Sequence, residues 1–389
     1  MLPTPRERRL LATLRQAGPL SRRELHERTG WRPNTVGSLV GGLLERGLLC
    51  EGEAELVGRG RPRVPVTIDP GRRAVLGMAL EPGQVSACRL NLLGERIDDV
   101  RLRAASDVSE TMAAASELLA TSDRLDQVIA VGLSVTGFVD PVAPSILLSS
   151  AMPAATPISL EPVHKALGDL PLILENDMHA LAAQWSLTHA AGPEEDILLV
   201  LVRDGAIGAA VLVDGRPNRG CVVGGNELGH TRFFIDTDRC YCGQVGCLER
   251  IVSSAFLHQR GVPTDSRLFE LLARDTSDNS AVQTVLDHLA IALSNAVNFI
   301  RPNRLVIVSE LADHPAVCDR LTESVRSGLL SVLASRVGIE TWNGPDGGFA
   351  ETAGWLALAS LYRHGWQPFP TAETDRPRRR RTPRQRASA

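Results

Sequence analysis

One histidine and three cysteines lie close together in the second half of the sequence, and they carry its most distinctive chemistry. These residues are His230, Cys240, Cys242 and Cys247. A closed tetrahedral zinc site takes a Cys3His set of this kind and leaves no open position for water. The neighbouring Gly243 and Gly246 allow the chain to wrap around an ion. The spacing predicts a structural Zn²⁺ that stiffens a loop; a group of buried or redox-active thiols is the alternative.

Residues 1–46 predict three short helices that would position a DNA-reading surface. A face of leucines indicates the first helix, over 5–16. Ser21 and Glu24 match a capping box at the start of a second helix, and a third is expected over 33–46. Two helices followed by a turn and a third helix form the arrangement that places the last helix in the major groove of DNA. The candidate DNA-contacting residues on this third helix are Arg32, Asn34, Thr35 and Ser38.

A loop rich in glycine and arginine follows the third helix. It spans residues 58–63 and separates two β-like pieces, 50–57 and 64–68. A short, flat loop of this kind fits a narrow minor groove, where the negative potential attracts arginine. We therefore expect Arg59 and Arg61 to contact operator DNA. A helical oligomerisation module with a solvated basic loop is the alternative.

The chain divides into three parts by its pattern. Residues 1–70 are expected to form a winged helix-turn-helix domain. In residues 71–370, apolar runs such as Val128–Leu133 alternate with helical segments, as they do in an α/β fold. Residues 371–389 are rich in arginine and lack apolar periodicity, so we expect a disordered tail. This tail either aids solubility or attracts DNA without regard to sequence.

The overall composition favours a protein of the cytoplasm. The chain has 389 residues, is 43% apolar and carries a net charge of −3, so it can bury a large core and is not a uniformly basic nucleic-acid coat. It contains no uninterrupted apolar run of about 18 residues. Its N-terminus is charged, unlike a secretory signal. We expect a cytoplasmic location and no membrane partner.

Three motifs make the sequence similar to a known family. The run Gly225–His230 followed by Cys240–Glu249 closely resembles the signature of the ROK family of repressors, open reading frames and sugar kinases. Glu175–Asp177 resembles the sugar-site segment of that family, and Val135–Asp140 resembles its Gly-Pro-Val-Asp loop. The resemblance implies a winged helix-turn-helix followed by a two-lobed, actin-like (ribonuclease H-like) α/β domain, with sugar bound between the lobes.

The resemblance also implies which residues hold the sugar. The residues that match the family's sugar contacts are Asn176, Asp177, Glu227, His230 and Glu249. Carboxylates and amides suit this role, because they exchange hydrogen bonds with hydroxyl groups in a partly dry cleft. In the family's kinases, the residue that matches Asp177 is the base that takes a proton from the attacking hydroxyl.

The three nucleotide-binding elements of the family's kinases are degraded here. The Asp-x-Gly-x-Thr motif is absent from the matching stretch 76–84, where Glu81 and Pro82 stand instead. The second phosphate turn reads Arg203–Gly208, and the adenosine element reads Val308–Leu311 without its glycine pair. Phosphoryl transfer depends on positioning and charge neutralisation, so this loss predicts no ATP-dependent activity and no catalytic residue. Residues 150–153 also lack an asparagine that often contacts the sugar.

These observations predict a sugar-responsive, DNA-binding transcriptional repressor that is not an enzyme. Its expected partners are operator DNA and a sugar or sugar phosphate effector, with Zn²⁺ as a structural cofactor and a homodimer or homotetramer as the assembly. Sugar would draw the lobes together and thereby change the spacing of the two DNA-reading helices. Two alternatives remain: an active sugar kinase that also binds DNA, and a regulator controlled by docking of a protein partner.

Overall fold

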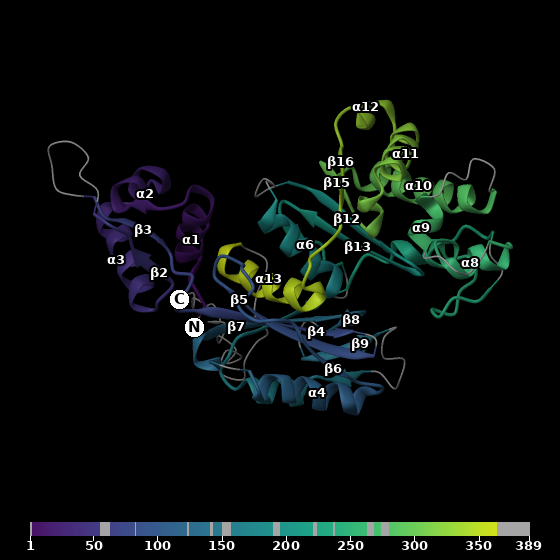
Figure 1. Cartoon of the computed structure of the whole chain (residues 1–389). Coiled ribbons are helices and arrows are strands. Elements are labelled where there is room, and N and C mark those ends of the chain that lie inside the picture. The colour runs from purple at the N-terminus through teal and green to yellow at the C-terminus, as the bar shows by residue number, and fades with distance from the viewer. Residues whose placement is uncertain are drawn as a thin grey trace, which may run out of the picture.

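The chain forms a small N-terminal domain joined to two α/β lobes (Figure 1). The computed structural model describes residues 2–54, 63–81, 83–122, 124–140, 143–149, 157–189, 195–220, 224–235, 238–262, 268–273 and 280–363.

The N-terminal domain has the three helices that the sequence predicts: α1 (Pro5–Ala17), α2 (Arg22–Thr29) and α3 (Pro33–Glu45). The capping box of α2 is confirmed, since the Ser21 backbone N–H donates to Glu24 Oε2 at 2.8 Å and the Glu24 N–H donates to Ser21 Oγ at 3.3 Å. A three-stranded antiparallel sheet closes the domain, in the order β1 (Leu20–Ser21), β3 (Pro65–Ile68), β2 (Leu49–Glu51).

The wing, which is the loop at 58–63 with the β-like pieces on either side of it, differs from the expectation in its first strand. The sequence predicted a β-like piece over 50–57, but β2 ends at Glu51 and residues 52–54 are irregular. After Glu51, the backbone N–H of Gly52 donates to the Pro65 carbonyl. Pro65 has no N–H with which to donate to the opposite strand, so the pairing of β2 with β3 ends there. Arg59 and Arg61 lie outside the described residues.

The first lobe is built on a five-stranded sheet in the order β11-β7-β4-β5-β6. β4 and β5 form a hairpin, whereas β7 and β11 run parallel to β4. These strands are β4 (Ala74–Glu81), β5 (Gln84–Asn91), β6 (Arg101–Ala104), β7 (Val128–Val135) and β11 (Leu172–Asn176). The lobe also contains α4 (Val108–Ala120), η1 (Leu125–Gln127), α5 (Glu161–Leu167) and a small sheet of β8 (Phe138–Val139), β9 (Ser145–Leu148) and β10 (Ile158–Ser159).

The second lobe repeats this design with a five-stranded sheet in the order β14-β13-β12-β15-β16. Its strands are β12 (Ile197–Arg203), β13 (Ala206–Val213), β14 (Arg216–Pro217), β15 (Arg304–Val308) and β16 (Gly338–Trp342). Its helices are η2 (Leu228–His230), α7 (Leu248–Ile251), α8 (Ser254–Gln259), α9 (Leu268–Ala273), α10 (Ser280–Ile300), η3 (Glu310–Asp313), α11 (Pro315–Ser327) and α12 (Ser331–Ala334). The alternation of strands and helices expected for an α/β fold is confirmed.

Two buried helices, α6 (Asp177–Thr188) and α13 (Gly348–Tyr362), lie between the two sheets (Figure 1). α13 contacts β4, β5, β7 and α6, and it is buried on all sides. Its approach to the first sheet requires glycine, because a Cβ atom at Gly77 or Gly132 would overlap backbone oxygens of α13. α1 also contacts α13, so the N-terminal domain rests on this same helix.

The described part of the chain contains no helix that is long and apolar enough to cross a membrane.

Candidate functional site

A cleft of about 560 Å³ lies between the lobes, beside the N-terminus of α6. Side chains from both lobes line it, including Thr136 and Ser149 from the first lobe and Ile207 from the second. The five residues predicted to hold the sugar all line this cleft: Asn176, Asp177, Glu227, His230 and Glu249. The structure therefore brings together residues that are as far apart as 73 positions in the sequence, Asn176 and Glu249 (249 − 176).

Asp177 is the first residue of α6, and its carboxylate is held in a fixed orientation. Thr136 Oγ1 donates to Asp177 Oδ2 at 3.0 Å, and the backbone N–H of Met178 donates to Oδ1 at 2.8 Å. Burial raises the pKa of Asp177 to about 6, and the charge of Glu81 adds to this effect. A carboxyl group with such a pKa accepts a hydrogen bond from a hydroxyl group and can take up a proton near neutral pH.

Asn176 has a second role that the sequence reading did not identify. Its side chain caps α6, because Oδ1 accepts from the Met178 N–H at 2.8 Å. Its Nδ2 donates to the Gly137 carbonyl at 2.7 Å, which fixes the turn between β7 and β8. One Nδ2 hydrogen remains for a ligand, so the amide both shapes the cleft and can contact a sugar.

Glu227 and Glu249 bring two further carboxylates to the cleft. Glu249 is buried, and its Oε2 accepts from the backbone N–H of Ile207 at 3.1 Å. Burial, together with the charges of Asp177 and Glu249, raises the pKa of Glu227 to about 7. Three carboxylates thus share one partly dry space, where each can accept hydrogen bonds from hydroxyl groups.

The histidine and three cysteines come together as the sequence predicts. Their donor atoms, one each from His230, Cys240, Cys242 and Cys247, lie within 4.8 Å of one another. The Cys242 and Cys247 sulfurs are 3.6 Å apart, and the Cys240 sulfur is 3.8 Å from His230 Nδ1. Tetrahedral zinc with Zn–S bonds of about 2.3 Å separates two sulfurs by about 3.8 Å, so the set fits zinc. Burial and the adjacent Cys242 and Cys240 thiols raise the pKa of Cys247 to about 12, so a divalent cation would be needed to hold the Cys247 thiol as a thiolate.

His230 belongs to both sites through its two ring nitrogens. Nδ1 points to the cysteine cluster, whereas Nε2 lies 3.1 Å from the Tyr241 hydroxyl and 3.7 Å from Glu227 Oε2. A metal on Nδ1 would fix the tautomer that carries a proton on Nε2, and this N–H would face the cleft. Tyr241, inside the cysteine motif, and Thr136, inside the Val135–Asp140 motif, are site residues that the sequence reading missed.

Comparison with known proteins identifies the family. The ROK family profile matches residues 82–359. The chain belongs to the ROK family. It is 23% identical over 359 residues to the DNA-binding transcriptional repressor Mlc of Escherichia coli strain K12, which covers 84% of this chain and 86% of that protein. An N-acetyl-D-glucosamine kinase of Escherichia coli O6:H1 is 29% identical over 239 residues, covering 56% of this chain and 78% of the kinase.

Solved ROK structures confirm the fold and separate into two groups by coverage. A ROK family transcriptional regulator, a homologue of the Escherichia coli MLC protein, superposes with a TM-score of 0.77 at 21% identity and covers 92% of this chain and 96% of its own. A ROK glucokinase from Streptomyces griseus, in complex with glucose and AMPPNP, superposes with a TM-score of 0.56 at 19% identity and covers 72% of this chain and 97% of its own. The regulator therefore matches the chain over a longer span than the kinase does.

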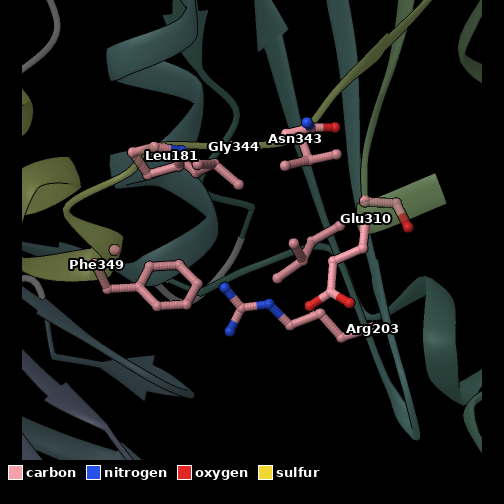
Figure 2. Close-up of a pocket in the computed structure, with 11 residues that line it drawn as sticks. Leu181, Arg203, Glu310, Asn343, Gly344 and Phe349 are labelled. Carbon is pink, nitrogen blue, oxygen red and sulfur yellow. The ribbon is translucent and has the colours of Figure 1, made fainter. Parts of the chain in front are cut away.

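A second, much smaller pocket is lined by residues of two of the three stretches that were matched to ROK nucleotide elements, 203–208 and 308–311 (Figure 2). Its volume is about 70 Å³, which suits a few water molecules. Arg203, Glu310 and Phe349 line it, and the Arg203 guanidinium points toward the Phe349 ring, 4.9 Å from the ring centre. This pocket thus holds a cation stacked on an aromatic ring and, in the same lining, a carboxylate.

The altered nucleotide elements have local structural roles. Ser86 Oγ donates to Glu81 Oε2 at 3.1 Å, which ties the end of β4 to β5. Asp204 Oδ1 accepts from the Ser254 N–H at 2.7 Å and holds the β12–β13 turn against α8. Ser309 Oγ accepts from the Leu311 N–H at 3.2 Å and caps η3. Pro82 and residues 150–153 lie outside the described residues.

The predicted DNA-contacting residues of α3 are placed at its start and on its outer face. Arg32, Asn34 and Ser38 are exposed, and Thr35 is half-buried. The opposite face of the helix is closed by Val36, Val40 and Leu43, which are fully buried. α3 therefore presents polar side chains to solvent on the side that a major groove would meet.

Proposed function

We propose that this ROK protein is a sugar-responsive, DNA-binding transcriptional repressor without ATP-dependent kinase activity. One contrast carries the proposal. The interlobe cleft of about 560 Å³ keeps five polar side chains suited to sugar hydroxyls, whereas the neighbouring nucleotide region has about 70 Å³ and is lined by Arg203 and Glu310. A sugar kinase needs both spaces, and a sugar sensor needs the first alone.

DNA binding is supported by the N-terminal domain. The exposed residues of α3 are Arg32, Asn34 and Ser38, with Thr35 beside them. The sequence predicts that Arg59 and Arg61 add a second DNA contact. We propose that two subunits pair so that their α3 helices enter successive major grooves of a near-palindromic operator. The extended match to a transcriptional regulator, over 92% of the chain, favours this arrangement.

The cluster of one histidine and three cysteines adjoins the cleft, where it would support sugar binding. His230 is a metal ligand and a cleft residue at once, and Cys242 also lines the cleft. We propose a structural Zn²⁺ that holds η2 and the start of α7, and with them Glu227 and Glu249, in place for the sugar. The metal takes no part in chemistry in this proposal.

One observation favours the alternative function, that of a sugar kinase. Asp177 has a pKa of about 6 and a fixed carboxylate, as a general base requires. The same features serve a sensor, because a buried carboxylate also binds hydroxyl groups tightly. The two functions differ in whether ATP is consumed, so a coupled assay of ADP formation with a panel of hexoses separates them. Docking of a protein partner in place of a sugar effector is the third possibility.

The experiment makes two measurements on each of three proteins: the wild type, Asp177→Asn and Glu227→Gln. Calorimetry gives sugar affinity, and fluorescence anisotropy gives operator affinity with and without sugar. Each variant should bind sugar about 10- to 100-fold more weakly, because a hydrogen bond to a charged group contributes ~1.5–3 kcal/mol. Operator affinity without sugar should hardly change. Glu117→Gln, which removes a charge from the exposed surface of α4, is the matched control.

Two results would contradict the proposal. Sugar-dependent ADP formation by the wild type would make the protein a kinase. Failure of every sugar and sugar phosphate in a broad panel to change operator affinity would leave protein docking as the means of control.

A further inference from the structure

Residues 376–386 contain seven arginines and no acidic side chain. The seven are Arg376, Arg378, Arg379, Arg380, Arg381, Arg384 and Arg386. We propose that this arginine segment is a further DNA contact, which binds phosphates of the same DNA that the N-terminal domain holds. The inference rests on the proposed function, because it requires DNA bound at α3.

The structure shows where the chain leaves the folded lobes on its way to this segment. The described residues end at Arg363, directly after α13. The Tyr362 ring centre lies 5.1 Å from the Arg15 guanidinium of α1, and Arg363 donates to the Ser186 carbonyl in the last turn of α6. Burial and the charge of Arg15 lower the pKa of Arg363, as expected for two guanidinium groups that lie near each other. The chain therefore leaves α13 beside the N-terminal domain (Figure 1).

The length of chain before the first arginine is sufficient to reach bound DNA. Twelve residues, 364–375, separate Arg363 from Arg376. An extended chain advances about 3.3 Å per residue, so Arg376 can lie up to roughly 43 Å from Arg363. A domain of about 70 residues has a radius of gyration of about 11 Å and is about 30 Å across. The arginine segment can thus extend past the N-terminal domain and meet DNA on the outer side of α3.

The distribution of charge favours such a contact. Residues 71–375, most of which form the lobes, contain 37 acidic and 23 basic residues, so their net charge of −14 repels DNA. Residues 1–70 contain 12 arginines and eight acidic residues, a net charge of +4. The arginine segment adds +7 to this and brings the positive charge available to DNA to +11. Each phosphate that an arginine neutralises releases counterions from DNA.

The acidic lobes are the competing partner for the same arginines. Double-stranded DNA carries one negative charge per about 1.7 Å of its axis and releases condensed counterions when it is bound. The lobes distribute a net charge of −14 over about 300 residues, so their charge density is far lower. DNA held at the N-terminal domain is therefore the favoured partner.

The test measures DNA binding by fluorescence anisotropy over a series of salt concentrations. It compares the full-length, zinc-loaded protein with the same protein lacking residues 376–389, on operator DNA and on a duplex of unrelated sequence. The truncation should reduce the slope of log K against log salt by about three or more, since each neutralised phosphate contributes about 0.9. Both duplexes should lose affinity by the same factor, because phosphate contacts do not distinguish bases. Replacement of all seven arginines with lysine should keep most of the slope, because it keeps the charge.

A second variant tests the reach of the segment. Deletion of residues 366–375 keeps all seven arginines but brings Arg376 to within about 10 Å of Arg363. Most of the arginines then cannot pass a domain about 30 Å across, so more than half of their contribution to the slope should be lost. Equal urea denaturation curves for all the proteins control for folding.

An unchanged salt slope after truncation overturns this inference and leaves the proposed repressor function intact. Tighter DNA binding after truncation also overturns it, and indicates that the arginine segment binds the acidic lobes. Failure of the full-length protein to bind DNA removes the proposed function itself, and the inference with it. The full-length and truncated proteins together therefore distinguish the two failures.

Discussion

The guanidinium carbon of Arg15 lies 5.1 Å from the centre of the Trp355 ring. Arg15 is in α1 of the N-terminal domain, and Trp355 is in α13, between the lobes. The Tyr362 ring centre is also 5.1 Å from this guanidinium, and Arg15 donates to the carbonyls of Leu93 at 3.1 Å and Leu187 at 3.5 Å. Leu187 lies in the last turn of α6, the helix that Asp177 begins, so one side chain touches both α13 and α6.

We predict from this contact that Arg15 couples the sugar cleft to the N-terminal domain. Arg15→Ala should keep sugar affinity and reduce the effect of sugar on operator affinity by roughly 1 kcal/mol, within the usual range of coupling free energies. Operator titrations with and without sugar measure this difference. Arg6→Ala removes the same charge from an exposed position of α1 and should keep the coupling. Equal coupling in wild type and Arg15→Ala would exclude this role.

The wing arginines should contribute to DNA affinity through charge. Replacing both Arg59 and Arg61 with Ala should weaken operator binding and lower the slope of log K against log salt by roughly two, about one for each lost contact. Fluorescence anisotropy over a series of salt concentrations measures the slope. Unchanged affinity and slope would favour a wing that is only a solvated loop.

The cysteine cluster should hold about one zinc ion per chain, as its Cys3His set of donor atoms indicates. Cys242→Ser should lose the metal and weaken sugar binding, because His230 and Glu249 lie on the segments that the ion joins. Metal analysis and calorimetry provide the two readouts. Cys50→Ser changes a thiol outside the cluster and should keep both properties. Purified wild type without zinc would contradict the assignment.

The pKa of Asp177 predicts a pH-dependent effect on stability. Burial raises this pKa from 3.8 to about 6, so between about pH 4 and pH 6 the folded protein holds a proton that the unfolded chain releases. The carboxyl group therefore destabilises the fold increasingly as pH rises through that window. Asp177→Asn should stabilise the sugar-free protein, by roughly 1 kcal/mol more at pH 7.5 than at pH 5.

Urea denaturation at the two pH values tests this expectation. Asp126→Asn, at an exposed position of η1, is the control for loss of an aspartate charge. An Asp177→Asn effect of the same size at both pH values would show that the carboxylate is not destabilised by burial.

Features that depend on a few adjacent residues could be predicted from the sequence. The capping box of Ser21 and Glu24 defines the start of α2, and the spacing of the cysteines around two glycines brings four metal donors together. The family motifs then placed Asp177 and Glu227 in one cleft. Each of these signals is local, so it survives without knowledge of the tertiary structure.

Features that depend on distant residues could not be predicted. Glu175, the residue before Asn176, forms an ion pair with Arg219. This pair joins β11 of the first lobe to the segment after β14 of the second lobe. Neither residue has a sequence pattern that indicates the other. The contact of Arg15 with two aromatic rings of α13 could not be predicted for the same reason, because it forms only when the domains assemble.

The position of α13 has a consequence for synthesis of the protein. This helix is the last described element of the chain, yet the Tyr362 hydroxyl donates to the Leu92 carbonyl, 270 positions earlier. Until the ribosome has released α13, the apolar face of β4 and β7 that receives it stays uncovered. The first lobe therefore completes its fold only after α13 has been synthesised, and a nascent chain that lacks this helix would expose that face to aggregation. Without α13, α6, which begins at Asp177, would also lack the helix that packs against it.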